Sequence, residues 1–396
     1  MKRRDFIKNT SLASSLFFVP DFVKAFDEAL SAQYGHKRLV IIQLAGGNDG
    51  LNTIVPFRND IYYKNRPKLS IGKNEVLKLN DELGLHPSLA PLRKLYDNGY
   101  ISIINNVGYP NPDRSHFRST DIWQTASASN EYLQSGWIGR YLDLYKQNPY
   151  NAIEVDDSLS LIMKGENTNG IATKDAQRLF RTSQAPFFKH VLKSQSNEHL
   201  NEHNLGYLYK TMISAESSAK YIYETSKTYI STNNYPNTGF ANQLKTIAQF
   251  INSGLNTNVY FSSLGGFDTH ANQANTQKRL LTQYSEAITA FVDDLKSKDS
   301  FKDTLVLTFS EFGRRVKQNA ANGTDHGAAN NVFIIGEHLK KQGVYNNLVD
   351  LNDLDNNGDL KFEIDFRSLY TTVLDRWLKV DSKSILSKNF KALDFI

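Results

Sequence analysis

Short apolar runs rich in β-branched and aromatic residues recur along the chain, separated by stretches with helical spacing. The runs are Leu39–Leu44, Ile101–Val107, Leu159–Met163, Val259–Leu264, Leu305–Phe309 and Val332–Ile335. Apart from Leu159–Met163, they have the composition of strands that are covered on both faces. This alternation is the feature that most constrains the fold, because strands separated by helices pair side by side in the same direction.

The stretches between these runs predict helices. They are Ser88–Asn98, Ile138–Tyr145, Leu208–Ser226, Gln243–Ser253, Thr276–Lys296 and Arg367–Leu378. In the longest of them the apolar residues fall three or four positions apart, at Leu280, Tyr284, Ile288, Phe291 and Leu295. Such a stripe faces a sheet. We therefore expect an α/β fold with a mostly parallel central sheet and helices on both faces.

The region from Gly165 to Asn237 has a different composition, rich in Asn, Ser and Lys around one helical stretch. We interpret residues 165–237 as a helical insertion over the sheet. Residues 36–396 would then form a single domain that carries this insertion.

The N-terminus predicts export. Lys2-Arg3-Arg4-Asp5-Phe6-Ile7-Lys8 is a twin-arginine pattern, and the apolar run from Thr10 to Pro20 follows it. This run is too short to span a bilayer as a helix of the mature protein. We expect residues 1–32 to be a signal region handled by the Tat export machinery, with the mature protein in the periplasm or outside the cell. The alternative is an N-terminal helix that happens to carry two arginines.

Composition excludes several classes of protein. The chain has 396 residues and a formal net charge of +5. Residues 1–25 hold five Lys/Arg and two Asp, so the mature chain carries +5 − 3 = +2. A net charge this small is not that of a nucleic-acid-binding protein, which carries a strongly positive surface. The sequence contains no cysteine, which excludes thiolate chemistry and Cys-ligated metals.

Polar and Gly-rich loops follow four of the predicted strands, where ligands gather in α/β sheets. They present Asp49, then Ser115 and His116, then Asp268 and His270, then Glu311, Arg314 and Arg315. A fifth loop, Gly323-Thr324-Asp325-His326-Gly327, precedes the last predicted strand. Carboxylate and imidazole together bind zinc, manganese or iron. The five loops therefore predict a metal site at one edge of the sheet.

Each of these residues also has a structural alternative. Asp49 can form a turn, and Ser115 can cap the helix that follows it. Glu311 and Arg314 can form a structural salt bridge. We interpret His86 and His116 as packing or capping residues. The segment Asp353-Leu-Asp355-Asn-Asn357-Gly358 resembles an EF-hand loop but has Ile364 at position twelve, so we expect a hairpin turn there.

Together the motifs of the chain resemble those of the DUF1501 family, an exported group similar to the alkaline phosphatase/sulfatase superfamily. They are Leu-Ala-Gly-Gly-Asn-Asp-Gly-Leu-Asn-Thr, Leu-His-Pro-Ser-Leu-Ala-Pro-Leu, Arg-Ser-His-Phe, Gly-Gly-Phe-Asp-Thr-His, Ser-Glu-Phe-Gly-Arg-Arg, Gly-Thr-Asp-His-Gly and Asp-Phe-Arg-Ser-Leu-Tyr. They cover nearly the whole mature chain.

The resemblance implies a role for each loop. Asp49 would bind metal, Ser115 would be the nucleophile, and Asp268 and His270 would bind a first metal. His326 would complete the first metal, with its neighbour Asp325 as a further candidate ligand.

The loop of Glu311 departs from the superfamily pattern, because Phe312 stands where a histidine is expected. A second metal would then be held by Asp49, Glu311 and Ser115, a set of oxygen ligands that suits Ca²⁺ or Mg²⁺. We therefore expect one or two divalent cations, with Zn, Ca, Mg and Mn all open. Arg314 and Arg315 are the predicted anion clamps, and Arg114 is the alternative.

The predicted function is a metal-dependent hydrolase of phosphate or sulfate esters. Its partner would be a small anionic ester or an envelope glycan or lipid, and we expect neither nucleic-acid binding nor an integral membrane segment. The alternative is a non-catalytic cell-envelope binding protein that kept the fold and part of the ligand set.

Overall fold

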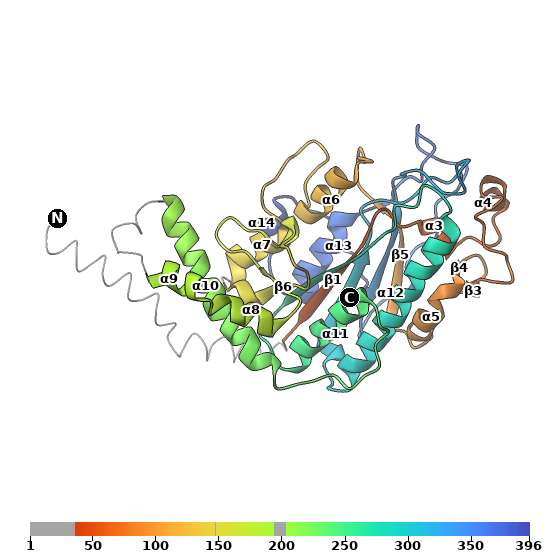
Figure 1. Ribbon diagram of the computed structural model, residues 1–396. Coiled ribbons are helices and arrows are strands. Elements are labelled where there is room, and N and C mark those ends of the chain that lie inside the picture. Colours follow the sequence, from red (N-terminus) through yellow and green to blue (C-terminus); the bar gives the residue numbers. More distant parts are fainter. Residues whose placement is uncertain (1–35, 147, 194–202) are drawn as a thin grey trace. The chain divides into compact units, whose positions relative to one another are not determined.

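Five of the six runs expected to form strands lie in one nine-stranded sheet of the computed structural model, which describes residues 36–146, 148–193 and 203–396 (Figure 1). The strands of this sheet are β1 (Arg38–Ala45), β5 (Ile101–Gly108), β6 (Ala152–Glu154), β7 (Ile171–Ala172), β8 (Val259–Gly265), β9 (Thr304–Phe309), β10 (Asn330–Ile335), β11 (Gly343–Val344) and β12 (Ile364–Asp365). The order is β11-β5-β10-β9-β1-β8-β6-β7, with β12 also paired to β5. The predicted α/β class is confirmed.

The sheet is mostly parallel, as predicted, and β10 is the strand that departs from this direction. It pairs antiparallel with β5 and with β9, whereas β1 is parallel to β8 and β9. The chain leaves β9 at its carboxyl end and enters β10 at the same edge of the sheet. The loop between them, residues 310–329, therefore stays at the edge where β1, β5 and β8 also end.

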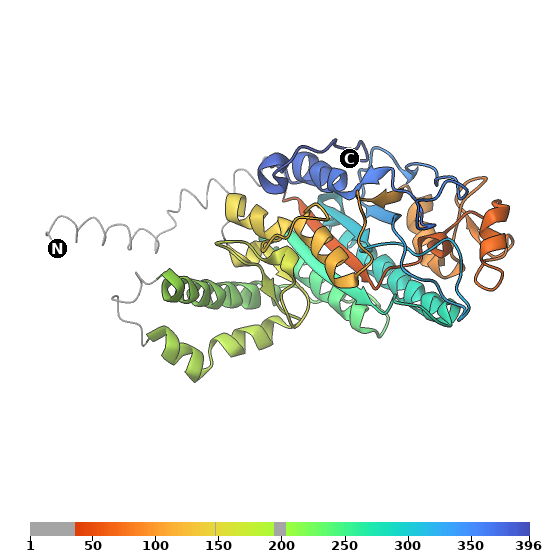
Figure 2. The ribbon, with the colours of Figure 1, turned by 90° about the horizontal axis from the view of Figure 1, so that it is seen from above.

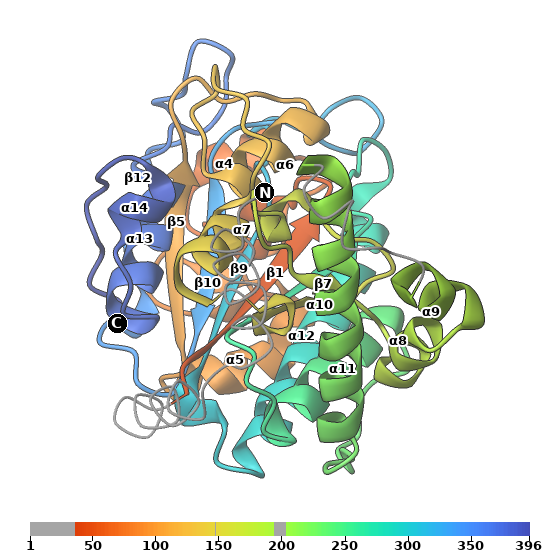
Figure 3. The ribbon, with the colours of Figure 1, turned by 90° about the vertical axis from the view of Figure 1, so that its left-hand side faces the viewer.

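Helices cover both faces of the sheet, as predicted (Figures 2 and 3). On one face lie α5 (Ala90–Asp97), α11 (Gly239–Asn252) and α12 (Gln273–Lys296). On the other lie α6 (His116–Thr125), α7 (Trp137–Tyr141), α13 (Phe366–Thr372) and α14 (Ser382–Leu386). Strand β1 supplies both cores, because Val40 and Ile42 belong to one cluster while Leu39 and Ile41 belong to the other. This alternation is the period-two pattern of a strand covered on both sides.

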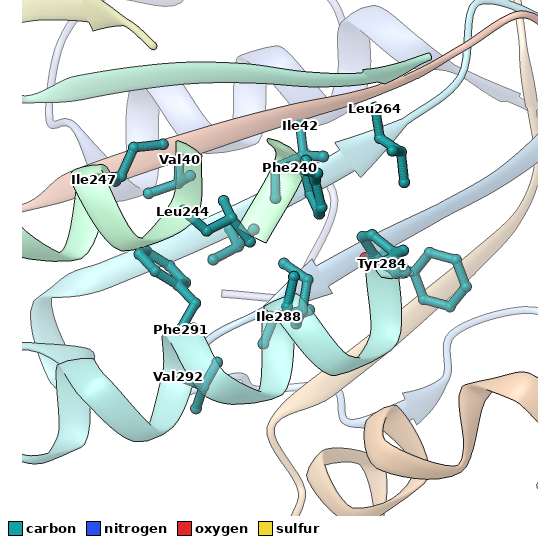
Figure 4. Close-up of a cluster of buried hydrophobic side chains, with 14 of the residues drawn as sticks. Val40, Ile42, Phe240, Leu244, Ile247, Leu264, Tyr284, Ile288, Phe291 and Val292 are labelled. Carbon is teal, nitrogen blue, oxygen red and sulfur yellow. The ribbon is translucent and has the colours of Figure 1, made fainter. Parts of the chain in front are cut away.

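The apolar stripe predicted for α12 is buried as expected. Leu280, Tyr284, Ile288, Phe291 and Leu295 are each at most 2% exposed. Figure 4 shows part of this stripe beside side chains of β1 and α11. Burying one such side chain contributes roughly 1.5–3 kcal/mol, so the stripe fixes α12 firmly against the sheet.

The strand predicted at Leu159–Met163 is wrong. Residues Leu161–Met163 form a single 3₁₀ turn, and the strand in this region is β6 (Ala152–Glu154). The Glu154 side chain accepts hydrogen bonds from the backbone N–H and the hydroxyl of Ser160, both at 2.6 Å. These bonds fold the chain back beside β6. The backbone N–H of Ser160 therefore donates to the Glu154 side chain and is not free to pair with a neighbouring strand.

The region 165–237 contains the edge strand β7 as well as α8 (Ala176–Ser183), α9 (Pro186–Lys193) and α10 (His203–Ser226). Helix α8 contacts α10 through the stacked rings of Phe180 and Tyr223, whose centroids lie 4.6 Å apart. Ala219 and Ile222 of α10 are fully buried. The last part of α10 therefore packs on the main body of the domain.

Shorter elements complete the described chain. They are α3 (Gly50–Thr53), α4 (Asp60–Asn65), and the antiparallel strands β2 (Ile54–Val55), β3 (Leu77–Lys78) and β4 (Gly84–Leu85). The two predicted helices that begin near Ile138 and Arg367 continue beyond α7 and α13 as π turns. A hairpin turn forms at Gly358, where Leu354 and Leu360 make an antiparallel bridge, as predicted for this segment.

The predicted twin-arginine region, residues 1–32, lies outside the described residues. The elements above belong to one compact unit, Arg38–Ile396. Among the described residues, no helix combines the length and the apolar character needed to cross a bilayer.

Candidate metal centre

Three side chains from distant parts of the sequence converge at the carboxyl edge of the sheet. They are His116 at the start of α6, Asp268 in the loop after β8, and His326 in the loop that enters β10. One ligand atom from each lies within 4.8 Å of the others. Asp268 Oδ1 is 3.3 Å from His116 Nε2 and 3.2 Å from His326 Nε2. The loop order of the sheet thus brings two imidazoles to one carboxylate oxygen.

The hydrogen bonds of the two histidines define their tautomers. His326 Nδ1 lies 2.7 Å from the backbone carbonyl of Arg114, and His116 Nδ1 lies 2.9 Å from Glu311 Oε1. A carbonyl or carboxylate oxygen can only accept, so each Nδ1 carries the proton. In the neutral form of each ring, Nε2 therefore directs its lone pair towards Asp268.

This donor set fits a divalent cation. Two imidazole lone pairs and a carboxylate oxygen face one another, and the arrangement becomes favourable when a cation lies between them. His116 Nε2 is buried and has no hydrogen-bond partner among the described residues. Two nitrogens and one carboxylate oxygen are a ligand set of catalytic zinc and related ions, which keep a further position open. The Asp268 side chain is 48% exposed, so the site opens to solvent.

Burial, hydrogen bonds and neighbouring charges shift the pKa values of the three candidate ligands. Burial by itself raises the pKa of the Asp268 carboxyl, but the hydrogen bond and the positive charge of Arg314 outweigh it and hold the pKa well below its usual range. Burial lowers the pKa of His326. The hydrogen bond to Glu311 raises the pKa of His116. These shifts favour the anionic form of Asp268 and the neutral form of His326, the forms that bind a metal, and the protonated form of His116.

Arg314 holds the loops of the site together. Its Nε donates to the carbonyl of Gly47 at 2.7 Å, its Nη1 to that of Thr324 at 2.8 Å, and its Nη2 to Asp268 Oδ1 at 2.7 Å. The Arg314 side chain is 0% exposed. The guanidinium of Arg314, which was predicted as an anion clamp, thus lies buried between the loops and orients Asp268.

Glycines allow these loops to approach so closely. Gly46 has φ +115°, and a Cβ there would lie 2.5 Å from the backbone nitrogen of Asp268. Gly47 has φ +71°, and its Cβ would lie 2.3 Å from Cε2 of Phe312. Both positions need the left-handed backbone and the missing side chain of glycine.

Glu311 orients the candidate ligand His116 through a hydrogen bond to its Nδ1. It is buried, and its Oε1 accepts hydrogen bonds from the Gly46 backbone at 2.7 Å and from His116. Phe312 packs its ring 4.8 Å from the rings of both His116 and His326. Glu311, which was predicted as a ligand, is therefore the hydrogen-bond partner of the candidate ligand His116, an arrangement commonly found behind metal-bound histidines.

Asp49 lies outside the group of converging ligand atoms. Its carboxylate forms a buried ion pair with Arg66, with 2.6 Å between Oδ2 and Nη1, and accepts a further hydrogen bond from Gln273. It also caps α3 by accepting from the backbone of Asn52. The contact with Asn52 agrees with the local structural role given as the alternative for Asp49, whereas the buried ion pair with Arg66 was not predicted.

Ser115 adjoins the candidate ligand His116 in sequence, and His270 contacts the candidate ligand Asp268. Ser115 is the N-cap residue of α6 and is exposed, and within the described chain its hydroxyl makes no capping hydrogen bond. It directly precedes the candidate ligand His116. His270 is 45% exposed, and its Nδ1 lies 2.8 Å from Asp268 Oδ1. It contacts the carboxylate without belonging to the group of three mutually close ligand atoms.

Asp325 and Arg315 point elsewhere. Asp325 is exposed, and its Oδ1 accepts a hydrogen bond from Asn319 at 3.2 Å. Arg315 is 41% exposed, and its Nε lies 3.6 Å from Asp359 Oδ1. Of the Asp325–His326 pair, the histidine is therefore the residue that faces the site. Arg315 keeps a partly solvent-facing guanidinium.

Sequence reasoning missed His116, which was interpreted as a packing or capping residue. A signal was present, because His116 opens a helix directly after a strand and its loop. Arg66 was also missed, and no sequence signal pointed to it.

The family model described as "Protein of unknown function (DUF1501)" matches residues 36–388 of the chain. No curated protein sequence matches the chain.

Several solved structures are similar to the chain at low identity. The lipoteichoic acid synthase LtaP from Listeria monocytogenes shares 10% identity, with 92% of this chain and 75% of that chain covered and a TM-score of 0.40. The PsFucS1 sulfatase from Pseudoalteromonas sp. shares 11% over 93% and 72%, with a TM-score of 0.39. The C-terminal periplasmic domain of EcEptC from Escherichia coli, in complex with Zn, shares 10% over 76% and 72%, with a TM-score of 0.35. Similarity at this level assigns no role to any residue.

Proposed function

The chain belongs to the DUF1501 family, and we propose that it is a metal-dependent hydrolase of phosphate or sulfate esters with Ser115 as its nucleophile. One observation carries the proposal, namely that His116, Asp268 and His326 converge and that the exposed Ser115 directly precedes His116 at the start of α6. A nucleophile next to a cation site is the arrangement that hydrolysis of a stable anionic ester requires.

His116, Asp268 and His326 would hold the cation, which when bound would polarise the ester and stabilise negative charge. The chain's own groups position the reaction. Ser115 stands at the N-terminus of α6, a helix of ten residues whose free N–H groups and dipole favour negative charge. The Asp113 carboxylate fixes the Ser115 backbone through a 2.7 Å hydrogen bond.

The proposed reaction has two balanced steps. The Ser115 oxygen bonds to phosphorus or sulfur and loses its proton, while the bond to the ester oxygen breaks and the leaving alcohol takes up a proton. Water then adds to phosphorus or sulfur and releases the serine hydroxyl together with the inorganic anion. Ser115 is regenerated after each turnover.

The competing candidate is a non-catalytic cell-envelope binding protein on the same fold. This candidate is favoured because two of the predicted oxygen ligands contact other side chains: Asp49 pairs with Arg66, and Glu311 pairs with His116. Such a protein would keep a cation and use it for binding a glycan or lipid, because fold does not determine function.

Export is part of the proposal and rests on the sequence. The twin-arginine pattern of residues 1–32 would direct the chain through the Tat machinery to the periplasm or the outside. The mature protein would be one domain, residues 36–396, with the insertion at 165–237. Its substrate would be a small anionic ester or an envelope glycan or lipid.

A panel of aryl phosphates and aryl sulfates, assayed after metal loading, tests the activity. Wild type should turn over at least one ester, and Ser115→Ala should lose that activity by about 10³-fold or more while still binding metal. Ser217→Ala, an exposed serine on α10, is the matched control and should keep full activity. Metal binding without turnover of any ester would instead support the binding protein.

A further inference from the structure

We infer that this site binds one divalent cation per chain, because the carboxylates expected to hold a second cation are engaged by Arg66 and His116 and because the guanidinium of Arg314 holds a permanent positive charge beside Asp268. The inference rests on the proposed metal site and specifies its composition. It concerns the number of ions, which the loop motifs left open between one and two.

Asp49, the first ligand expected for a second ion, is occupied by another cation. The Arg66 and Asp49 side chains are 0% and 1% exposed, and Arg66 Nη1 lies 2.6 Å from Asp49 Oδ2. Arg66 is itself held by the backbone carbonyls of Val316 and Arg315, at 2.9 and 2.8 Å. A buried pair of this kind cannot release its carboxylate without leaving a charge unpaired in the interior.

Glu311, the other carboxylate expected for a second ion, is also engaged. Its Oε1 accepts from the backbone of Gly46 and from His116. Its Oε2 lies 3.4 Å from the Ser310 hydroxyl and 3.5 Å from Gln43 Nε2. The hydrogen bond to His116 sets the tautomer that the first cation needs, so drawing Glu311 into a second centre would disrupt the first.

Arg314 contacts the same oxygen of Asp268 as His116, His270 and His326 do. Its Nη2 lies 2.7 Å from the same Oδ1 that faces the two histidines, and Nη2 also donates to the carbonyls of Gly46 and Phe267. Because loop backbone fixes the guanidinium from several directions, it cannot swing away. One dication at Oδ1 already lies near this like charge, and a second one would be repelled by both the guanidinium and the first ion.

The resulting site keeps a net positive charge. A dication, the Asp268 carboxylate and the Arg314 guanidinium sum to +2 − 1 + 1 = +2, and the Glu311 carboxylate behind His116 brings the total to +1. A positive site without a second metal suits an anionic ester. Arg314 thereby acts as a positioning residue and a fixed charge, out of contact with the substrate.

Metal stoichiometry tests the count of ions. The full mature chain is stripped with chelator, reloaded separately with Zn²⁺, Mn²⁺ and Ca²⁺, desalted and measured by elemental analysis. We expect one equivalent in wild type, one in Asp49→Asn, and less than about 0.2 in Asp268→Asn. Two equivalents in wild type would overturn the inference while leaving the hydrolase intact. None in wild type would overturn both.

Paired variants test the role of Arg314. Arg314→Lys and Arg314→Gln lose similar loop contacts, and only the first keeps the charge. If a like charge stands beside the cation, the Gln variant should bind the probe metal about tenfold more tightly than the Lys variant by calorimetry. A purely structural role predicts equal or weaker binding by the Gln variant, which would overturn the assignment. Circular dichroism checks that each variant is folded before the affinities are compared. If neither Arg314 variant folds, the metal content of Glu311→Gln, with one equivalent expected, provides the test.

Discussion

Removing Arg66 should destabilise the fold strongly, because Asp49 would remain buried without its cation. In Arg66→Met the apolar part of the side chain stays, so the change isolates the charge and its hydrogen bonds. Arg66 donates to Asp49, to Asn52 Oδ1 at 2.8 Å, and to the carbonyls of Val316 and Arg315. Losing it therefore affects the loops after β1 and β9 together.

The expected cost can be worked from these contacts. Breaking a fully buried ion pair by deleting one partner costs about 3–5 kcal/mol. Each backbone carbonyl that loses its donor adds about 1 kcal/mol when water cannot replace it. We therefore expect Arg66→Met to lower the free energy of unfolding by at least about 4 kcal/mol, which is a large part of the stability of an ordinary domain.

Urea denaturation of wild type, Arg66→Met, Asp49→Asn and the double variant, followed by circular dichroism, measures this cost. The double variant should be less destabilised than the two single changes predict together, because it buries no unpaired charge. Arg93→Met is the control, since the Arg93–Asp97 pair on α5 is 30% and 54% exposed and should contribute less than about 1 kcal/mol.

A loss below about 1 kcal/mol in Arg66→Met, together with additive effects in the double variant, would contradict the buried Asp49–Arg66 pair. That outcome would mean that Asp49 is free of Arg66 in solution. Asp49 would then return as a candidate metal ligand.

Three further outcomes follow from the same structure. Burial raises the pKa of Glu154 from 4.5 to about 7. Between these pH values the folded state holds a proton that the unfolded state has lost. The free energy of unfolding should therefore fall by up to about 3 kcal/mol as pH rises from about 4.5 to about 7. Urea titrations of wild type and Glu154→Gln at several pH values should show this slope in wild type alone, and equal slopes would contradict it. Gly47→Ala, with φ +71° and a Cβ that would lie 2.3 Å from Phe312, should lower the midpoint of thermal unfolding far more than Gly254→Ala, which has φ +80° and open space. Equal shifts would mean that the loop after β1 relaxes freely. Adding chelator should lower the midpoint of wild type but not of Asp268→Asn in thermal scans, since a ligand at 100 times its Kd stabilises by about 2.7 kcal/mol. An unchanged wild-type midpoint would argue against a resident cation.

The sequence by itself determined the elements and the edge at which the site lies. Val259–Leu264 and Leu305–Phe309 became β8 and β9 because β-branched and aromatic runs fit a sheet covered on both faces. The strand predicted at Leu159–Met163 did not form, because the backbone N–H of Ser160 donates to the side chain of Glu154. Asp268 and His326 were named from Gly-flanked loops, and the three-dimensional structure places both in one cluster.

Tertiary structure decided which polar residues face that cluster. β10 runs antiparallel, and this direction keeps the His326 loop at the carboxyl edge; no local pattern in the strand reveals the direction of its neighbours. Asp49 meets Arg66 in the interior, while Glu311 meets His116 across a separation of 195 residues. Each carboxylate has the chemistry of a metal ligand in sequence. Whether it binds a metal or a buried partner depends on which group the fold brings within 3 Å, because a charge taken out of water pairs with the nearest opposite charge.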